Sequence, residues 1–166
     1  MTTLAYHDLS RFREKNLDKK IVFCSGSFDL FHAGHVIFFE DCKNLGDVLV
    51  VAVGPDHDIQ ANKGSGRPIL NEHARLKIVD SLKSVDYSFI SRPTAKGAHW
   101  LTPIEEILGA LKPDVWAVNG DGGEMEHRQE LALRFGVLLV VLNRTAPPEY
   151  EGLSTTSLLK KIRDLS

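Results

Sequence analysis

Five short apolar runs, separated by segments with helical periodicity, dominate the hydrophobic pattern of the chain. They span residues 21–24, 48–53, 87–90, 115–118 and 137–142. Continuous apolar runs of this length are typical of strands covered on both faces, and their alternation with helices predicts parallel strands joined by βαβ crossovers. We therefore predict a Rossmann-like three-layer α/β sandwich with a five-stranded parallel sheet, in which ligands bind beyond the carboxyl ends of the strands.

The residues before the first run show a weaker pattern. Leu9, Phe12 and Leu17 recur among charged residues and predict a short helix at the edge of the domain. A chain of 166 residues can bury a core without disulfides or structural metal. We expect a single domain over residues 1–166, with residues 1–18 as a helical extension.

Candidate chemistry follows the first apolar run, where a strand, a tight turn and the start of a helix are predicted. Gly26 allows the backbone to approach a ligand, and the helix start offers N–H groups to an anion. His32 and His35 share one face of that first turn and suit a phosphate. The same two histidines could instead be a partial metal site or polar residues at a helix end.

A second cluster lies in residues 54–68, which are rich in Gly and Pro and predict a flexible loop. Lys63 and Arg67 could close over a triphosphate, the first as a point charge and the second as a bidentate fork. The alternative is a solvated loop with ordinary surface cations. Asn71 is a plausible cap for the next helix, on which Arg75 faces either solvent or phosphates.

Three later segments also follow predicted strands. Residues 119–123, with Gly120 and Asp121, form either a turn chosen for its backbone angles or a site for a base and ribose. His99 and Trp100 are equally compatible with packing and with acceptor binding. Hydroxyl residues 154–156 stand at a predicted helix start, where Ser154 can cap the helix and the group can cradle an anion.

Composition narrows the function classes. The chain has 20 basic and 22 acidic residues and a net charge of −2, so it shows no general attraction to nucleic acid or to an anionic membrane. Cys24 and Cys42 predict buried thiols in a reducing compartment, and they form no zinc motif. The amino terminus lacks signal-peptide features and no apolar run is long enough to span a bilayer, so we expect a cytoplasmic protein.

These motifs together resemble a known superfamily. Gly26-Ser27-Phe28-Asp29 followed by His32-Ala33-Gly34-His35 resembles the G-x-F-D-x-x-H-x-G-H motif of the HxGH nucleotidyltransferases, and residues 151–156 resemble their E-G-I-S-T-T motif. A further set of positions is similar in spacing to the adenylyltransferase domain of bacterial ADP-heptose synthase: Asp56, Lys63-Gly64, Arg67-Pro68, Asn71 and Arg75.

The resemblance implies direct displacement, in which a phosphate oxygen of an acceptor attacks the α-phosphorus of a nucleoside triphosphate and expels pyrophosphate. It implies catalysis by His32, His35 and Lys63. It implies nucleotide binding by Gly26, Ser27, Phe28, Asp29, Gly34, Arg67, Gly120, Asp121, Ser154, Thr155 and Thr156. Asp56, Arg75 and Arg144 are candidate contacts to phosphates or acceptor, although Arg144-Thr145 is separated from Glu151, unlike in the cytidylyltransferases.

Partners and alternatives follow from the same resemblance. It implies Mg²⁺ bridging the phosphates and a homodimer, although the sequence itself shows no dedicated carboxylate cage. The spacing favours ATP as donor and a sugar phosphate such as heptose 1-phosphate as acceptor. A cytidylyltransferase acting with CTP on glycerol phosphate, another sugar phosphate or a phosphonate is the nearest alternative. A non-catalytic nucleotide-binding module and a metal-binding protein using His32 and His35 are alternatives of other classes.

Overall fold

The computed structural model describes residues 3–120, 123–143, 148–150 and 152–165. Its five strands are β1 (Ile21–Gly26), β2 (Val48–Val53), β3 (Tyr87–Ile90), β4 (Val115–Asn119) and β5 (Leu138–Leu142). They pair in parallel in the order β3-β2-β1-β4-β5, which confirms the predicted five-stranded parallel sheet. The strand order reverses between β1 and β4, so the carboxyl ends of these strands form the topological switch point.

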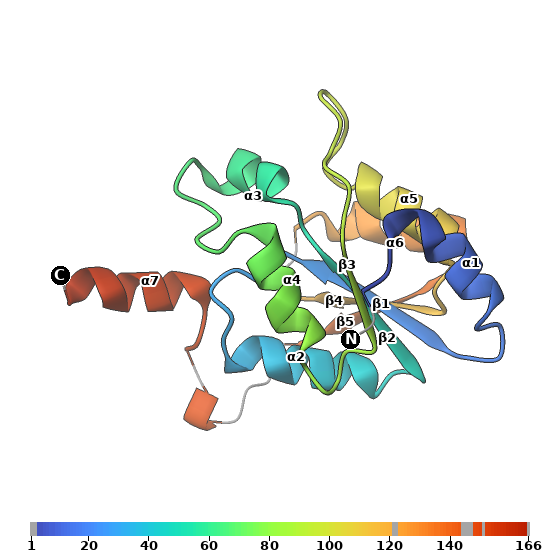
Figure 1. Ribbon diagram of the computed structural model, residues 1–166, viewed down its shortest axis with the longest axis horizontal. Helices are drawn as coiled ribbons and strands as arrows, with labels where there is room; N and C mark the ends of the chain where they lie inside the picture. The colour runs from blue at the N-terminus through green and yellow to red at the C-terminus, as the bar shows by residue number, and fades with distance from the viewer. Residues whose placement is uncertain (1–2, 121–122, 144–147, 151, 166) are drawn as a thin grey trace.

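Helices cover both faces of this sheet (Figure 1). The α-helices of the described chain are α1 (Leu9–Glu14), α2 (Ala33–Lys43), α3 (Asp56–Lys63), α4 (Glu72–Asp80), α5 (Thr102–Leu111), α6 (Met125–Phe135) and α7 (Thr155–Asp164). Two short 3₁₀ helices span Tyr6–Asp8 (η1) and Pro148–Tyr150 (η2). Alternate side chains along β1 divide between two cores: Phe23 packs with α1, α5 and α6, whereas Cys24 packs with α2 and α4. The three-layer architecture follows from this division.

The amino-terminal segment forms a helix, as predicted, and it joins the core. Leu9 and Phe12 of α1 are buried against α5. Asp114, at the start of β4, accepts a hydrogen bond from the backbone N–H of Ile21 at 2.7 Å and pairs with Arg13 at 3.0 Å. This carboxylate therefore connects α1 to the first residues of β1 and β4.

The prediction of a flexible loop over residues 54–68 is wrong for its first half, because Asp56–Lys63 form helix α3. Asp56 and Asp58 lie in the first turn and Lys63 in the last, which complements the helix dipole. Ile59 is buried and holds the helix on the domain. The helix ends at Gly64, whose φ of +93° suits glycine.

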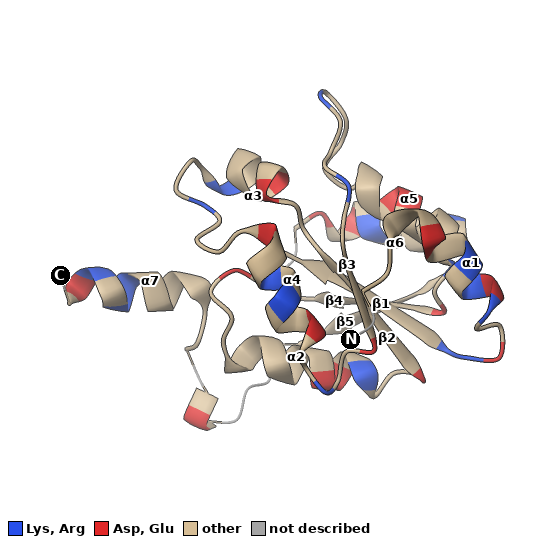
Figure 2. Cartoon of the chain, viewed as in Figure 1, with Lys and Arg blue, Asp and Glu red and all other residues tan. Residues whose placement is uncertain are grey.

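Charged residues of both signs are interspersed along most helices, with basic residues at the end of α3 and in the loop that follows it (Figure 2). Within the described residues, no helix combines the length and the apolar character needed to cross a membrane.

Candidate active site

The turn between β1 and α2 has a tightly constrained backbone. Phe28 and Leu30 adopt φ values of +49° and +47°, a region that side chains rarely occupy. The Phe28 ring folds back onto Gly26, where an added Cβ would lie 2.8 Å from Cζ of the ring. Gly26 is therefore needed for the turn itself, and the strained backbone indicates that the turn is fixed by contacts around it.

His32 and His35 are held together at the start of α2. Their rings stack with centroids 4.0 Å apart, and the His35 ring also stacks on Phe31 at 5.0 Å. Nδ1 of His35 accepts a hydrogen bond of 3.4 Å from the backbone N–H of His32. In the neutral imidazole the proton of His35 is then on Nε2. Gly34 makes this arrangement possible, because a Cβ there would lie 3.0 Å from the His32 ring.

Asp29 connects this turn to the loop that follows α3. The carboxylate is only 2% exposed and pairs with the guanidinium of Arg67 at 2.7 Å. It also accepts backbone N–H bonds from Ile69 at 2.9 Å, Leu70 at 3.0 Å and Leu30 at 3.1 Å. Burial raises the pKa of the Asp29 carboxyl, but the Leu70 and Ile69 N–H groups and Arg67 together lower this pKa below its ordinary value. The carboxylate is thus a positioning group.

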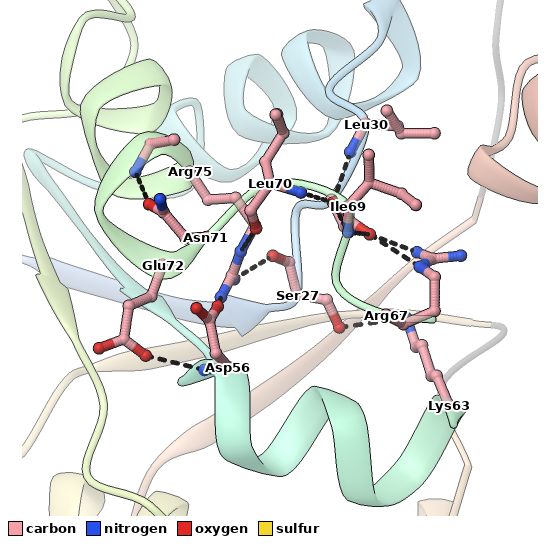
Figure 3. Close-up of polar contacts among 12 residues, drawn as sticks. Ser27, Leu30, Asp56, Lys63, Arg67, Ile69, Leu70, Asn71, Glu72 and Arg75 are labelled. Atoms are coloured by element: carbon pink, nitrogen blue, oxygen red, sulfur yellow. Dashed lines mark hydrogen bonds and ion pairs between the residues drawn. The ribbon is translucent and has the colours of Figure 1, made fainter. Parts of the chain in front are cut away.

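Arg75 lies behind the turn, with a fully buried side chain (Figure 3). Its guanidinium donates to the carbonyl oxygens of Ser27 at 2.6 Å and Leu70 at 2.9 Å, and to the Asp56 carboxylate at 2.6 Å. Asp56 and Arg75 thus pair with each other, and their contact with phosphates or acceptor stays a prediction. They support the turn from within the protein.

Lys63 ends α3 beside the same turn, and its ammonium donates to Oγ of Ser27 at 3.1 Å (Figure 3). Burial and the nearby guanidinium of Arg67 lower the pKa of Lys63. A bound anion would relieve this unfavourable positive environment. Lys63 and Ser27 also line a pocket at the carboxyl ends of β1, β2 and β3, together with Ser25, Gly26, Ala52, Gly54, Pro55, Asp58, Ile59, Asn62, Ser91, Trp100, Pro103 and Ile104.

The start of α7 lies against the histidine turn, although it is far away in sequence. The hydroxyl of Thr155 donates to the backbone carbonyl of Asp29 at 2.8 Å, and the carbonyl of Leu153 lies 3.8 Å from the position of a Cβ on Gly34. Ser154 caps the helix by accepting the N–H of Ser157 at 3.0 Å. The fold therefore brings two helix amino termini, with their partial positive charges, to one place.

Several predicted residues lie elsewhere or outside the described chain. Thr156 and Gly120 are exposed, the latter just after β4. Asp121 and Arg144 fall outside the described residues. Among the described residues, the one group of side chains suited to a metal does not include His32 or His35. The metal-binding interpretation of these two histidines therefore has no support.

Sequence reasoning did not identify three polar residues that line the pocket, namely Asp58, Asn62 and Ser91. Asp58 in α3 accepts from the backbone N–H and the hydroxyl of Thr94, at 3.0 and 2.8 Å, and so holds the loop after β3 against the pocket. Asn62 and Ser91 add polar groups to the lining. Ser91 directly follows β3, and this place at a strand's carboxyl end was the signal that could have identified it.

A Rossmann-like sheet with paired histidines and two helix starts near its switch point suits a nucleotidyltransferase. The chain belongs to the cytidylyltransferase-like family, whose model matches residues 23–161. The matched range includes most of β1, the other four strands and both helix starts of the site.

Curated relatives include the bifunctional protein HldE of several bacteria. The chain is 38% identical over 146 residues to that of Pseudomonas savastanoi pv. phaseolicola, covering 87% of this chain and 28% of the relative. It is 35% identical over 150 residues to that of Aliarcobacter butzleri, covering 90% of this chain and 28% of the relative. The chain thus spans little more than a quarter of the length of these relatives.

Solved structures show similar folds. A lipopolysaccharide core biosynthesis protein from Thermoplasma volcanium matches with a TM-score of 0.60 and 28% identity, covering 78% of this chain and 98% of that one. A pantoate-β-alanine ligase from Francisella tularensis matches with a TM-score of 0.69 and 18% identity, covering 97% of this chain and 73% of that one. At 18% identity, the match to the pantoate-β-alanine ligase shows only that the two chains share a fold.

Replacing Arg75 with Met should lower the free energy of unfolding by about 3 kcal/mol, because the carbonyl oxygens of Ser27 and Leu70 lose a buried charged donor. Urea denaturation measures this loss. Arg134→Met is a matched control, because Arg134 is exposed and pairs with Glu105 at the surface, where about 0–1 kcal/mol is expected. Equal losses in the two variants would contradict a supporting role for Arg75.

Asp29→Asn tests the buried carboxylate through pH. Because the folded pKa of Asp29 is depressed, its ionisation stabilises the fold above the ordinary carboxyl pKa of about 4, and this contribution is lost as pH falls through the lowered value. The stability difference between the original chain and Asp29→Asn should therefore shrink as urea midpoints are measured from neutral pH to about pH 2. Asp18→Asn, at an exposed side chain, serves as control. A difference that stays constant with pH would refute the assignment.

Proposed function

We propose that the chain transfers a nucleoside monophosphate from a nucleoside triphosphate, with ATP favoured, to a sugar phosphate such as heptose 1-phosphate, releasing pyrophosphate. One observation carries this proposal: the hydrogen bond from Thr155 to the Asp29 carbonyl joins the amino terminus of α7 to the histidine turn, beside a pocket that contains Lys63. Similarity to HldE, a bifunctional ADP-heptose synthase, supports the adenylyl donor and the heptose acceptor.

The arrangement suits direct displacement. An acceptor phosphate oxygen forms a bond to the α-phosphorus while the bond from the α-phosphorus to the bridging oxygen breaks, and pyrophosphate leaves with its electron pair. In this proposal the triphosphate rests against His32, His35 and the start of α7, where N–H donors compensate the charge that develops on phosphoryl oxygens. No protein nucleophile is required.

The acceptor would enter from the other side of the turn. Lys63 and Ser27 line the pocket and are joined by a hydrogen bond, so they suit the acceptor's phosphate. Asn62 and Ser91 can bond to sugar hydroxyls, and the Trp100 ring offers an apolar face to a sugar. Binding the triphosphate and the acceptor on different sides of the turn positions the attacking oxygen against the α-phosphorus. Positioning is a major part of phosphoryl-transfer catalysis.

Mg²⁺ is part of the proposal, but the described carboxylates near the turn do not form a cage for it. Asp29 is engaged with Arg67, Asp56 with Arg75 and Asp58 with Thr94. Mg²⁺ commonly keeps several waters and binds substrate phosphates. We therefore assign it to the oxygens of the triphosphate itself and attribute no step of the reaction to it.

A cytidylyltransferase is the second candidate, because the family model that matches residues 23–161 is cytidylyltransferase-like. The two candidate functions differ in the base of the nucleoside triphosphate that the chain would use. The purified chain should be incubated with ATP, CTP, GTP or UTP and each of heptose 1-phosphate, glycerol 3-phosphate and other sugar phosphates, and pyrophosphate measured. Release with ATP and heptose 1-phosphate supports the proposal, and release with CTP alone supports the alternative. Triphosphate binding without release for every pair would indicate a non-catalytic module.

His35→Gln should lower kcat by about 10²–10³-fold and change KM much less, because the Nε2–H donor contributes most where charge develops in the transition state. Steady-state pyrophosphate release measures both constants. His73→Gln, on the exposed side of α4, is the control and should retain full activity. A change confined to KM would mean that His35 only binds the nucleotide.

Lys63→Met should weaken acceptor binding and lower kcat/KM for the acceptor more than for the triphosphate, since Lys63 lies in the pocket with Ser27. Varying each substrate at saturating levels of the other separates these effects. Lys83→Met, at an exposed residue distant from the pocket lining, is the matched control. Equal losses of kcat/KM for the acceptor and for the triphosphate would contradict the proposal that they bind in separate parts of the site.

A further inference from the structure

Three residues that the proposed reaction does not use meet where the loop after β3 reaches the start of α6. They are His99, Glu124 and His127, and their ligand atoms all lie within 4.8 Å of one another. Nε2 of His99 lies 3.0 Å from a carboxylate oxygen of Glu124, and the His99 and His127 rings stack with centroids 4.5 Å apart. Among the described residues this is the one group of side chains suited to hold a metal ion.

The ligand set and its spacing are those of a transition-metal site. Glu124 occupies the N-cap position of α6 and His127 follows three positions later, so both residues stand at the start of one helix. This Glu-x-x-His spacing recurs in metal sites built on helices, and two imidazoles with one carboxylate form a common zinc ligand set with one position left open. His99, from a different loop, completes the set.

The distances fit a site that tightens when a metal enters. Tetrahedral Zn²⁺ at about 2.0–2.1 Å from each ligand needs ligand atoms about 3.3 Å apart. The His99 and Glu124 atoms already meet this, and the widest pair must close by about 1.5 Å from its present limit of 4.8 Å. The side chains of His99 and Glu124 are each 42% exposed, so they can make this adjustment by rotation.

One hydrogen bond must change when the metal binds. Nδ1 of His99 accepts the backbone N–H of Leu101 at 3.2 Å, so the neutral ring carries its proton on Nε2, the atom closest to Glu124. Coordination through Nε2 of a neutral ring requires the proton to move to Nδ1, and the hydrogen bond from Leu101 is then given up. The neighbouring guanidinium of Arg128, which donates to the carbonyl of Gly123 at 3.0 Å, also opposes a cation. Both features weaken the site without removing it.

We propose that His99, Glu124 and His127 bind one Zn²⁺ ion at the rim of the pocket. The ion would cross-link the loop after β3 to α6, and Trp100, next in sequence to His99, lines the pocket. Zinc would thereby fix the position of the Trp100 ring and leave one coordination position open to water or to an anionic oxygen. This site is separate from the Mg²⁺ that accompanies the triphosphate.

The test measures zinc binding by the full chain, without nucleotide or acceptor, so that its outcome does not depend on the proposed reaction. The protein is freed of metal with a chelator and titrated with Zn²⁺ by calorimetry. We expect saturable binding of one ion per chain that weakens as pH falls, because the ligands must be deprotonated. Co²⁺ titrated in parallel should give the visible absorption of a four-coordinate site. The absence of saturable binding by the unaltered chain would overturn the proposal.

Variants locate the ion. Loss of an outer-sphere partner costs ~10–100-fold in metal affinity, and His99→Ala and His127→Ala should each cost more than that. Their urea midpoints should stay near that of the unaltered chain, because neither side chain is buried. His7→Ala removes an exposed histidine 3.7 Å from the carboxylate of Asp8, and should retain full affinity. His35→Gln should retain it too. Binding that survives both cluster variants, or that is lost with His35→Gln, would overturn the assignment.

Discussion

The buried carboxylate of Asp29 is the interaction on which the candidate site depends. It is an anion almost removed from water, and it is tolerated because Arg67 and three backbone N–H groups surround it. Phe28 and Leu30, on either side, have strained backbone angles that these bonds can hold in place. The position of the histidines is therefore set by a charge that does not itself touch the ligand in the proposed reaction.

Three basic side chains surround this turn and have two different roles. Arg75 and Arg67 are engaged with Asp56 and Asp29, and they fix the shape of the turn. Lys63 instead lines the pocket. Burial and the charge of Arg67 lower its pKa. Because the buried ion pairs hold the backbone rigid, a phosphate group would meet donors that need no rearrangement, which is the condition for electrostatic stabilisation of a transition state.

The strands were predictable because each is a continuous apolar run, and such runs occur where a sheet is covered on both faces. Helix α3 was missed, since Ile59 is its one buried residue and a single apolar position gives no stripe. The histidine turn and the Ser154 cap carry local motifs and were found. The positioning role of Asp29 was not predicted, because its partners Ile69 and Leu70 lie about 40 positions away in the sequence. The Glu-x-x-His spacing was visible, but nothing in the sequence places His99 beside it.

The hydrogen bond between the Thr155 hydroxyl and the Asp29 carbonyl spans 126 positions of the sequence. All five strands and both helical layers are complete by Leu142, so the scaffold does not need the segment that contributes this hydroxyl. A chain cut after Leu142 would therefore keep all five strands of the sheet and lose the segment whose hydroxyl donates to the histidine turn.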